Sequence, residues 1–441
     1  MKRIAWMALI AAGAAVTGCN IGLKYSVGGT VTGLLGSGLV LENNSGNDLS
    51  LASNGTFTFT DGIKNNGAYS VTVKTQPSNP SQTCTVHNGS GTIHKAKVTN
   101  IIVSCTQTGR FAYVANQLSN NLSAYSINSA TGALTPIVGS PFADGGTAPK
   151  SLAVDPNGRF LYVANNGSND VSVYSIDGTT GALTSAGLPS ATGSGPEAVT
   201  VDPTDSYVYV ANLSANSVSA YTINSATGLL TELSNSPFAV GGQPSSLTID
   251  PSGSFLYVTN FSDGSVSVLQ IDPATGSLSS ISGSPFGAGA GAISIAIDPA
   301  GTFAYVANET AAAISEYSIN ASTGALTVVS GSPLSVGSSP ESLAVDPAGR
   351  YVYAANVTAK NQVAAYSITP SSGALTPGSP VPSGTFPVSL ALDPSGLFVY
   401  VANDNSNDIS VYAVDATTGV LSQVSQSPFA AGNEPRSIAI D

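Results

Sequence analysis

A repeat of 47 to 49 residues fills the C-terminal part of the chain and constrains the fold more than any other feature. The stretch "SLAVDPNGRFLYVAN" at 151–165 returns as "SLTIDPSGSFLYVTN" at 246–260 and as "SLAVDPAGRYVYAAN" at 342–356. Such a period is typical of propellers and other repeat folds, in which each unit is one supersecondary element. Each unit contains one asparagine at the end of "YVAN" or a variant of it, so the repeat has seven units: Asn116, Asn165, Asn212, Asn260, Asn308, Asn356 and Asn403.

Each unit contains four short apolar segments, which in the second unit are "SLAVD", "RFLYVAN", "VSVYSID" and a weaker "GALT" followed by a turn. The segments are rich in Val and Tyr, which favour strands, and turn residues such as Asp-Pro-x-Gly lie between them. Four strands per unit are what one propeller blade requires. The sequence therefore predicts an all-β chain with a seven-bladed β-propeller over residues 108–441.

The two ends of the repeat are complementary. The first unit begins at its second segment, "GRFAYVAN" from Gly109, and the chain stops at "SIAID", which ends with Asp441. We expect these terminal strands to pair within one blade and close the ring, because closure removes exposed sheet edges.

Residues 25–107 have a different character, with seven short alternating segments that predict a separate β-sandwich domain. Its charged residues, four lysines with Lys24 just before the domain against three carboxylates, form no catalytic cluster. A spacer next to the membrane is the simplest interpretation of this domain.

The N-terminus has the three parts of an export signal: Lys2 and Arg3, an apolar run, and a small-residue end. "VTGC" at 16–19 resembles a bacterial lipobox, which implies a signal peptide over 1–18, a lipidated Cys19 and a tether over 19–24. A plain secretion signal with an incidental cysteine is the alternative. With Cys19 lipidated, Cys84 and Cys105 remain, and we expect them to form a disulfide in an oxidising compartment.

The repeat resembles the YVTN-type propeller repeats of bacterial surface proteins, and residues 257–260 carry that string. It is also similar to the seven-bladed lactonase family that includes 6-phosphogluconolactonase. The latter resemblance implies hydrolysis of a cyclic sugar ester as an activity. Propellers host many unrelated functions, so the fold alone does not decide between activities.

Residues that recur in all seven units are expected to build blades, so a specialised site should lie where equivalent positions differ. The position after the recurring proline, at the mouth of the central channel, differs most. Around the ring it reads Arg436, Lys150, Glu197, Ser245, Ile293, Glu341 and Val388.

This ring of positions predicts a candidate site for one small ligand. Glu197 or Glu341 would activate water as the catalytic base, and Lys150 and Arg436 would bind an anionic or developing oxyanionic group, with Ser245 as a further ligand-binding residue. The alternative is a solvated rim with incidental ion pairs.

Several chemistries are disfavoured for the repeat region. It has no cysteine or histidine, since His87 and His94 lie in the small domain, so neither a zinc or iron centre nor a Ser-His-Asp triad is expected. "DNSND" at 404–408 is the best candidate for calcium ligation, but a polar turn is the preferred interpretation. We expect no metal and no cofactor.

The net negative charge of the repeat region disfavours anionic partners. The repeat region holds six cationic residues against 22 of the 25 acidic residues of the chain, so nucleic acid would be repelled and a phosphorylated sugar would meet little positive potential.

From the sequence alone we favour a monomeric binding or assembly module in the bacterial cell envelope. Its lipid would hold it at the outer membrane or cell surface, and its partner would be an envelope protein or a small carbohydrate-like ligand. The alternative is a lactonase-like carboxylic-ester hydrolase that acts on a sugar or acyl lactone at the propeller mouth. A passive surface-layer component is a third interpretation.

Overall fold

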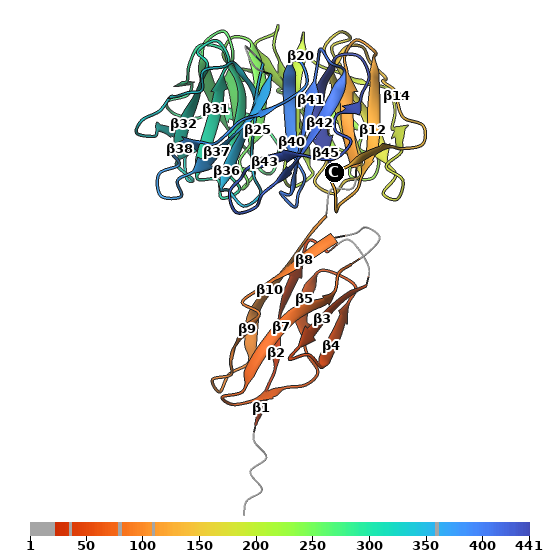
Figure 1. Cartoon of the computed structure of the whole chain (residues 1–441), viewed down its shortest axis with the longest axis vertical. Coiled ribbons are helices and arrows are strands. Elements are labelled where there is room, and N and C mark those ends of the chain that lie inside the picture. Colours follow the sequence, from red (N-terminus) through yellow and green to blue (C-terminus); the bar gives the residue numbers. More distant parts are fainter. Residues whose placement is uncertain (1–22, 35–37, 78–81, 108–110, 358–360) are drawn as a thin grey trace, which may run out of the picture. The chain divides into compact units, whose positions relative to one another are not determined.

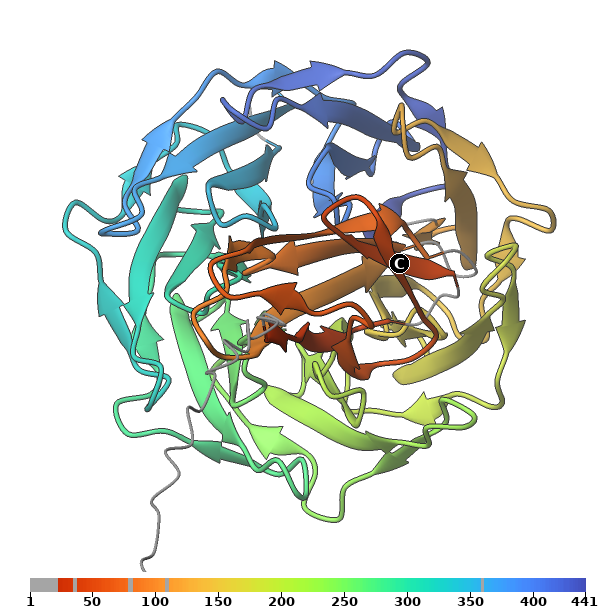
Figure 2. The same cartoon turned by 90° about the horizontal axis from the view of Figure 1, so that it is seen from below.

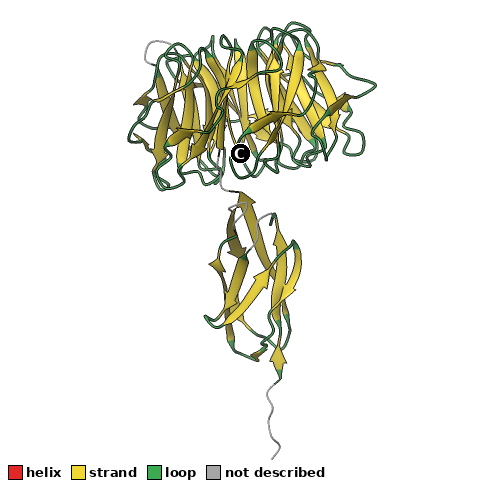
Figure 3. Ribbon diagram, turned by 90° about the vertical axis from the view of Figure 1, so that its right-hand side faces the viewer, coloured by secondary structure: helices red, strands yellow, loops and turns green. Residues whose placement is uncertain are grey.

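The computed structural model describes residues 23–34, 38–77, 82–107, 111–357 and 361–441 (Figure 1). The chain divides into two compact units, Met1–Thr106 and Gln107–Asp441. The regular structure of the described residues consists of strands (Figure 3), and none of these residues forms a helix of the length and hydropathy that would cross a membrane. The expected signal peptide, and the tether up to residue 22 with its Cys19, lie outside the described residues.

The N-terminal unit is the β-sandwich that the alternating segments predict. Two four-stranded sheets, in the orders β5-β2-β10-β8 and β4-β3-β7-β9, enclose one core that includes Val27, Leu41 and Ile101. The sequence did not predict that β10 pairs with β2 in parallel. The strands are β1 (Lys24–Tyr25), β2 (Val27–Thr32), β3 (Leu39–Asn43), β4 (Asn47–Leu51), β5 (Gly55–Thr58), β6 (Ile63–Lys64), β7 (Ala68–Thr75), β8 (Gln82–His87), β9 (Ser90–Thr92) and β10 (Val98–Gln107).

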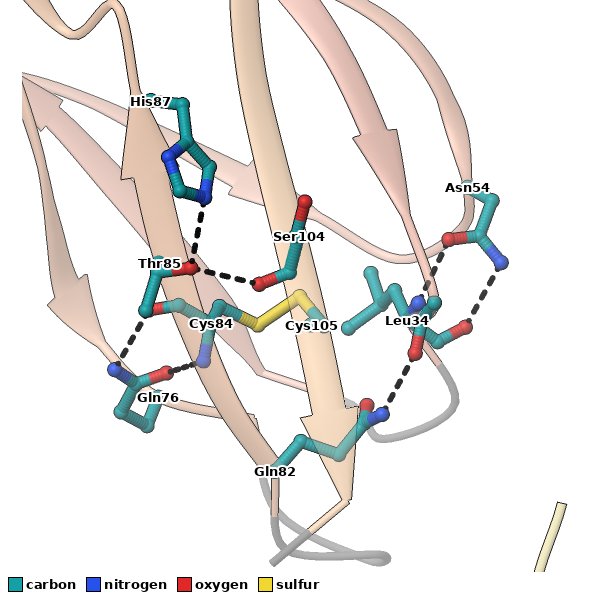
Figure 4. The surroundings of a disulfide bond; sticks show 10 residues. Leu34, Asn54, Gln76, Gln82, Cys84, Thr85, His87, Ser104 and Cys105 are labelled. Atoms are coloured by element: carbon teal, nitrogen blue, oxygen red, sulfur yellow. Dashed lines mark hydrogen bonds between the residues drawn. A yellow bond between two sulfur atoms is a disulfide. The ribbon is translucent and has the colours of Figure 1, made fainter. Parts of the chain in front are cut away.

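A disulfide joins Cys84 on β8 to Cys105 on the neighbouring strand β10 (Figure 4), as we expected for the two cysteines that remain besides Cys19. Gln76 holds the same strand through both of its amide atoms. Its Oε1 accepts from the Cys84 amide at 2.7 Å, and its Nε2 donates to the Cys84 carbonyl at 3.1 Å. By closing a loop of 21 residues, the bridge stabilises the sandwich by about 3 kcal/mol on the chain-entropy account.

The second unit is a ring of seven sheets, each of which is one propeller blade (Figure 2). We number the blades so that blade 1 contains β11 and blades 2 to 7 follow in chain order. From blade 1 to blade 7, the innermost strands are β45 (Pro435–Ile440), β15 (Pro149–Val154), β20 (Pro196–Val201), β25 (Pro244–Ile249), β30 (Ala292–Ile297), β35 (Pro340–Val345) and β40 (Pro387–Leu392).

The second strand of every blade is buried along its whole length, because both of its faces pack against neighbouring blades. These strands carry the "FAYVAN"-like segments, in which the tyrosine is fully buried. They are β11 (Phe111–Asn116), β16 (Phe160–Asn165), β21 (Tyr207–Asn212), β26 (Phe255–Asn260), β31 (Phe303–Asn308), β36 (Tyr351–Asn356) and β41 (Phe398–Asn403).

The third and fourth strands complete the predicted blade. The third strands are β12 (Asn121–Ile127), β17 (Asp170–Ile176), β22 (Ser217–Ile223), β27 (Ser265–Ile271), β32 (Ala313–Ile319), β37 (Gln362–Ile368) and β42 (Asp408–Val414). The fourth strands are β13 (Leu134–Pro136), β18 (Leu183–Ser185), β23 (Leu230–Glu232), β28 (Leu278–Ser280), β33 (Leu326–Val328), β38 (Leu375–Pro377) and β43 (Leu421–Gln423).

Each blade also has a fifth, two-residue strand where the sequence predicted only a turn. It pairs with the first two residues of the third strand, so the "SPF" segment continues the sheet after the bend. These short strands are β14 (Phe142–Ala143), β19 (Ser190–Ala191), β24 (Phe238–Ala239), β29 (Phe286–Gly287), β34 (Leu334–Ser335), β39 (Val381–Pro382) and β44 (Phe429–Ala430).

Glycine allows successive blades to pack closely. Gly181 of blade 2 has a φ of 73°, and a Cβ on it would lie 2.4 Å from the Phe111 ring of blade 1. The Tyr113 hydroxyl donates to the Gly181 carbonyl at 3.0 Å. Equivalent glycine and aromatic pairs recur at every blade junction, so the recurring "TG" and "FAYVAN" segments join the blades.

The ring closes as predicted. β45 pairs antiparallel with β11, and the Asp441 amide donates to the Phe111 carbonyl at 3.1 Å. The Phe111 amide donates in return to Asp441 Oδ1 at 2.8 Å. The strand that begins at Phe111 and the strand that precedes Asp441 therefore lie side by side in blade 1 (Figure 2).

Candidate functional site

The seven channel-mouth positions line one hollow of about 180 Å³. Each is the second residue of an innermost strand, so the ring brings side chains from all seven blades to the same opening. The structure thus brings together every site residue that the sequence predicts for the propeller: Lys150, Glu197, Ser245, Glu341 and Arg436, with Ile293 and Val388 between them.

A β-bulge explains why this position faces the hollow. In blade 2, Pro149 pairs with Asn165 and Ser151 pairs with Ala164, which leaves Lys150 as an extra residue without a partner in the ladder. The same register shift occurs in all seven blades. A bulge redirects a side chain at a strand end, so each blade presents its variable residue to the channel mouth.

Lys150 and Glu197 form an ion pair between blades 2 and 3. Lys150 Nζ lies 3.4 Å from Glu197 Oε1, and both side chains are only partly exposed. Asn166 Nδ2 donates to the other carboxylate oxygen, Oε2, at 3.3 Å. Both oxygens of Glu197 are therefore engaged by donors.

Two neighbours orient Arg436. Its Nε donates to Gln117 Oε1 at 2.7 Å, and its Nη1 lies 3.3 Å from Asp404 Oδ2. Asp404 is buried, and burial raises the pKa of this carboxyl although Arg436 opposes the shift. The guanidinium is thus held in place by a neutral and an acidic group.

Glu341 differs from the other acidic side chains of the hollow. Among the described residues it makes no ion pair and no side-chain hydrogen bond. Removal from water, reinforced by the nearby Glu309 carboxylate, raises the pKa of Glu341 to about 7, although Arg436 and Lys150 oppose the shift. A carboxyl group with this pKa exchanges protons near neutral pH, as a general base requires.

Ser245 lies in the hollow, but its hydroxyl already has partners. Its Oγ donates to the Ala292 carbonyl at 2.9 Å and lies 3.0 Å from Thr259 Oγ1. The hydrogen bond to Ala292 connects blades 4 and 5, whereas Thr259 lies in blade 4 with Ser245. Ile293 and Val388 are the two apolar side chains among the seven channel-mouth positions.

A second set of residues lies around the hollow and is not among the predicted site residues. Gln117, Asn166, Glu309 and Asp404 each follow the recurring asparagine at the end of a second strand. This position also varies between blades, so the same reasoning applied to it would have found them. Asp404 was interpreted only as part of a polar turn.

Other candidates lie away from the hollow. His87 is an exposed residue of the sandwich whose Nε2 lies 3.4 Å from Thr85 Oγ1 (Figure 4). The recurring aspartates cap turns, as Asp155 does by accepting from the amides of Arg159 and Phe160. Within the described ranges, no group of three or more His, Cys, Asp or Glu side chains is arranged to bind a metal ion.

The site can supply a base, two cations and a wall of mixed polarity in one small opening. Glu341 is placed to accept a proton. Lys150 and Arg436, each held by an acidic neighbour, supply positive potential without being free to move away. Such an arrangement suits addition of water to a carbonyl group.

Comparison with known proteins gives one family. Residues 67–244, 188–293 and 284–439 match the family described as "Lactonase, 7-bladed beta-propeller", so the match extends over most of the chain. No curated protein matches the sequence.

Solved structures share the propeller fold. A Bacteroides uniformis protein described as a candidate 6-phosphogluconolactonase is 21% identical, with a TM-score of 0.68 over 76% of this chain and 100% of its own. The periplasmic gluconolactonase of Pseudomonas aeruginosa is 21% identical, with a TM-score of 0.65 over 75% of this chain and 98% of its own. A Lactobacillus plantarum protein is 22% identical, with a TM-score of 0.64, over 76% of this chain and 100% of its own.

Proposed function

Because the chain belongs to the seven-bladed β-propeller lactonase family, we propose that it hydrolyses a lactone at the propeller mouth. The sequence alone favoured a binding or assembly module. The family match, together with two structural neighbours described as lactonases, supports the alternative instead. The observation that carries this proposal is Glu341, a partly buried carboxyl with a pKa of about 7 beside two cations in the hollow.

In this mechanism Glu341 acts as the general base. Its carboxylate takes a proton from a water molecule as the water oxygen bonds to the lactone carbonyl carbon, and the carbonyl oxygen becomes an oxyanion. Lys150 and Arg436 stabilise the negative charge that develops. When the intermediate collapses, the bond between the carbonyl carbon and the ring oxygen breaks. The ring oxygen takes the proton back from Glu341, and the product is an open hydroxy acid.

Glu197 has a different part in the proposal. Because Lys150 and Asn166 engage both of its oxygens, neither oxygen is free to face a water molecule, and Glu197 acts as a positioning residue for Lys150. Asp404 does the same for Arg436.

The charge around the hollow favours an uncharged lactone over a phosphorylated one. Both cations already face acidic side chains, and Glu309 and Glu341 add further negative potential. A phosphate group would have to displace one of these carboxylates and would then lie near the others, at an electrostatic cost.

We therefore expect the full chain to hydrolyse D-glucono-δ-lactone with a kcat/KM at least about tenfold higher than that for its 6-phosphate, a difference of about 1.4 kcal/mol. The measurement is initial acid release, followed by a pH indicator and corrected for spontaneous hydrolysis. A preference for the phosphorylated lactone would contradict the charge argument. If neither sugar lactones nor acyl lactones are hydrolysed, the binding-module interpretation is the better one.

We also propose that a lipid on Cys19 holds the enzyme at the bacterial outer membrane or cell surface. The export signal and the "VTGC" string support this proposal. A thioether-linked diacylglycerol with an amide-linked third chain anchors more firmly than one acyl chain, because each buried methylene adds about 0.8 kcal/mol.

Replacing Cys19 by serine is expected to move the protein from the membrane fraction to the soluble fraction, because the acylated sulfur is lost. Immunoblots of fractionated cells and metabolic labelling with a fatty acid would measure the change. A variant that remains in the membrane fraction, or a wild-type chain that takes up no fatty acid, would exclude the anchor.

A further inference from the structure

A ring of serines runs around the channel wall, one residue further along each innermost strand than the channel-mouth position. Six blades have serine there and blade 3 has Ala198. At five junctions the serine Oγ accepts from a backbone amide of the next blade at 3.1 to 3.2 Å. The serine ring consists of Ser437, Ser151, Ser246, Ser294, Ser342 and Ser389.

Ala198 interrupts the serine ring between blades 3 and 4. By repeat geometry, the amide opposite Ala198 belongs to Leu247, which pairs with Val258 in the register that Leu152 and Val163 have in blade 2. The Leu152 amide points out of its sheet to Ser437 Oγ at 3.1 Å, so the Leu247 amide points in the same way toward Ala198. Alanine has no oxygen to accept this hydrogen bond.

The next junction of the serine ring is also open. Ser246 Oγ has no hydrogen-bond partner among the residues that the structure describes, whereas the serines of five other blades accept from the following blade. Ala198 and Ser246 both line the hollow. The wall therefore presents one amide donor at the junction of blades 3 and 4, where alanine lacks the oxygen that serine supplies in the other blades, and one free hydroxyl at the junction of blades 4 and 5.

We propose that the gap between Ala198 and the Leu247 amide binds one ring hydroxyl of the substrate, and that Ser246 Oγ at the next junction binds a second. One ring hydroxyl can accept from the Leu247 N–H and a second can donate to Ser246 Oγ, whereas an unsubstituted lactone has no hydroxyl for either. The inference rests on the proposed lactone hydrolysis and deepens it, because it makes blades 3 and 4 a specificity wall for hydroxylated lactones.

The position of the gap fits this role. Ala198 is in blade 3 and Glu341 is in blade 6, on the other side of a seven-blade ring. A lactone whose carbonyl carbon faces Glu341 directs the rest of its ring toward blades 3 and 4. Binding energy at this wall would be the same in the ground state and the transition state, so it would lower KM and leave kcat nearly unchanged.

The test is Ala198→Ser, which supplies the missing oxygen. The new Oγ is expected to accept from the Leu247 amide, as its five counterparts do, and to occupy the gap. The ratio of kcat/KM for D-glucono-δ-lactone to that for δ-valerolactone should fall at least about tenfold, through a higher KM for the sugar lactone. Because a sixth bond is added to the ring, the melting temperature should stay the same or rise, which excludes misfolding as the cause.

Ser389→Ala is the matched control, because it opens an equivalent gap at another junction by removing the acceptor of the Ile438 amide. It should lower the melting temperature without lowering the ratio between the two lactones. If Ala198→Ser leaves the ratio within about twofold of wild type while the chain hydrolyses both lactones, the gap is not a hydroxyl subsite and the hydrolase proposal stands.

Binding of two lactams, which resist hydrolysis, separates this inference from the proposed function. D-Glucono-δ-lactam should bind the wild-type chain more tightly than δ-valerolactam in calorimetric titrations, and Ala198→Ser should remove the difference. If the chain shows this binding pattern but hydrolyses no lactone, the subsite proposal stands and the hydrolase proposal fails. Equal binding of the two lactams, or no binding of either, would overturn the subsite.

Discussion

Replacing Glu341 by glutamine is expected to lower kcat for lactone hydrolysis by about a hundredfold or more, the typical contribution of a positioned general base. Glutamine keeps the shape of the side chain but cannot take a proton from water. Because Glu341 makes no ion pair among the described residues, its replacement leaves no charge without a partner, so the fold should be unaffected. Steady-state rates and a melting curve for the same preparation measure both effects.

The pH profile gives a second measure of the same change. The pKa of Glu341 is raised to about 7, so the group is protonated and inactive below this pH. For the wild-type chain, kcat/KM should therefore rise with unit slope as the pH approaches 7 and reach a plateau above it. The remaining activity of Glu341→Gln should lack this step.

Glu232→Gln is a suitable control, because Glu232 is an exposed residue of the outer strand β23. It should retain the wild-type rate and profile. A fully active Glu341→Gln variant would exclude Glu341 as the base. If Glu197→Gln is inactive although Lys150 keeps its place in the hollow, Glu197 is the general base instead.

The propeller fold could be predicted from the sequence because the pattern of strands and turns that defines one blade is repeated seven times. One blade gives little information, but seven copies in register separate residues that build strands from residues that vary. Two features of the fold were not predicted. The two-residue fifth strands are too short to show a periodicity, and the parallel pairing of β2 with β10 joins segments far apart in a domain without repeats.

The candidate site was predicted in part, for a related reason. The variable position after the proline was visible as a difference between equivalent residues, and the structure places all seven of these residues around one hollow. Their partners come from the ends of neighbouring strands. Gln117 could be connected with Arg436 only through the pairing of β45 with β11, and Asp404 only through the contact between blades 7 and 1.

The sequence also could not separate the two glutamates. Glu197 and Glu341 occupy equivalent positions in their blades, and their difference lies in what surrounds them. Glu197 has Lys150 and Asn166 as donors, whereas Glu341 faces the carboxylate of Glu309. The sequence did not single out Ala198, because an alanine in a strand is ordinary until five of its six counterparts are seen to make the same hydrogen bond.

Deleting residues 435–441 is expected to abolish cooperative folding of the propeller. The deletion removes β45, which supplies the innermost strand of blade 1 and covers the inner edge of β11. It also removes Ile438, whose buried side chain alone is worth about 2–5 kcal/mol. Together with the lost ladder, this cost is of the order of the whole 5–15 kcal/mol that stabilises a typical domain.

Asp441→Ala separates loss of the strand from loss of its last contact. It removes the acceptor of the Phe111 amide but keeps β45, so it should lower the free energy of unfolding by only about 1 kcal/mol. Melting followed by circular dichroism compares the two variants with the full chain, and the sandwich with its disulfide should give a separate transition in both. Without β45, the inner edge of β11 is unpaired and exposed to solvent. If the propeller of the shortened chain nevertheless melts within a few degrees of the full chain, its stability does not depend on the pairing of β11 with β45.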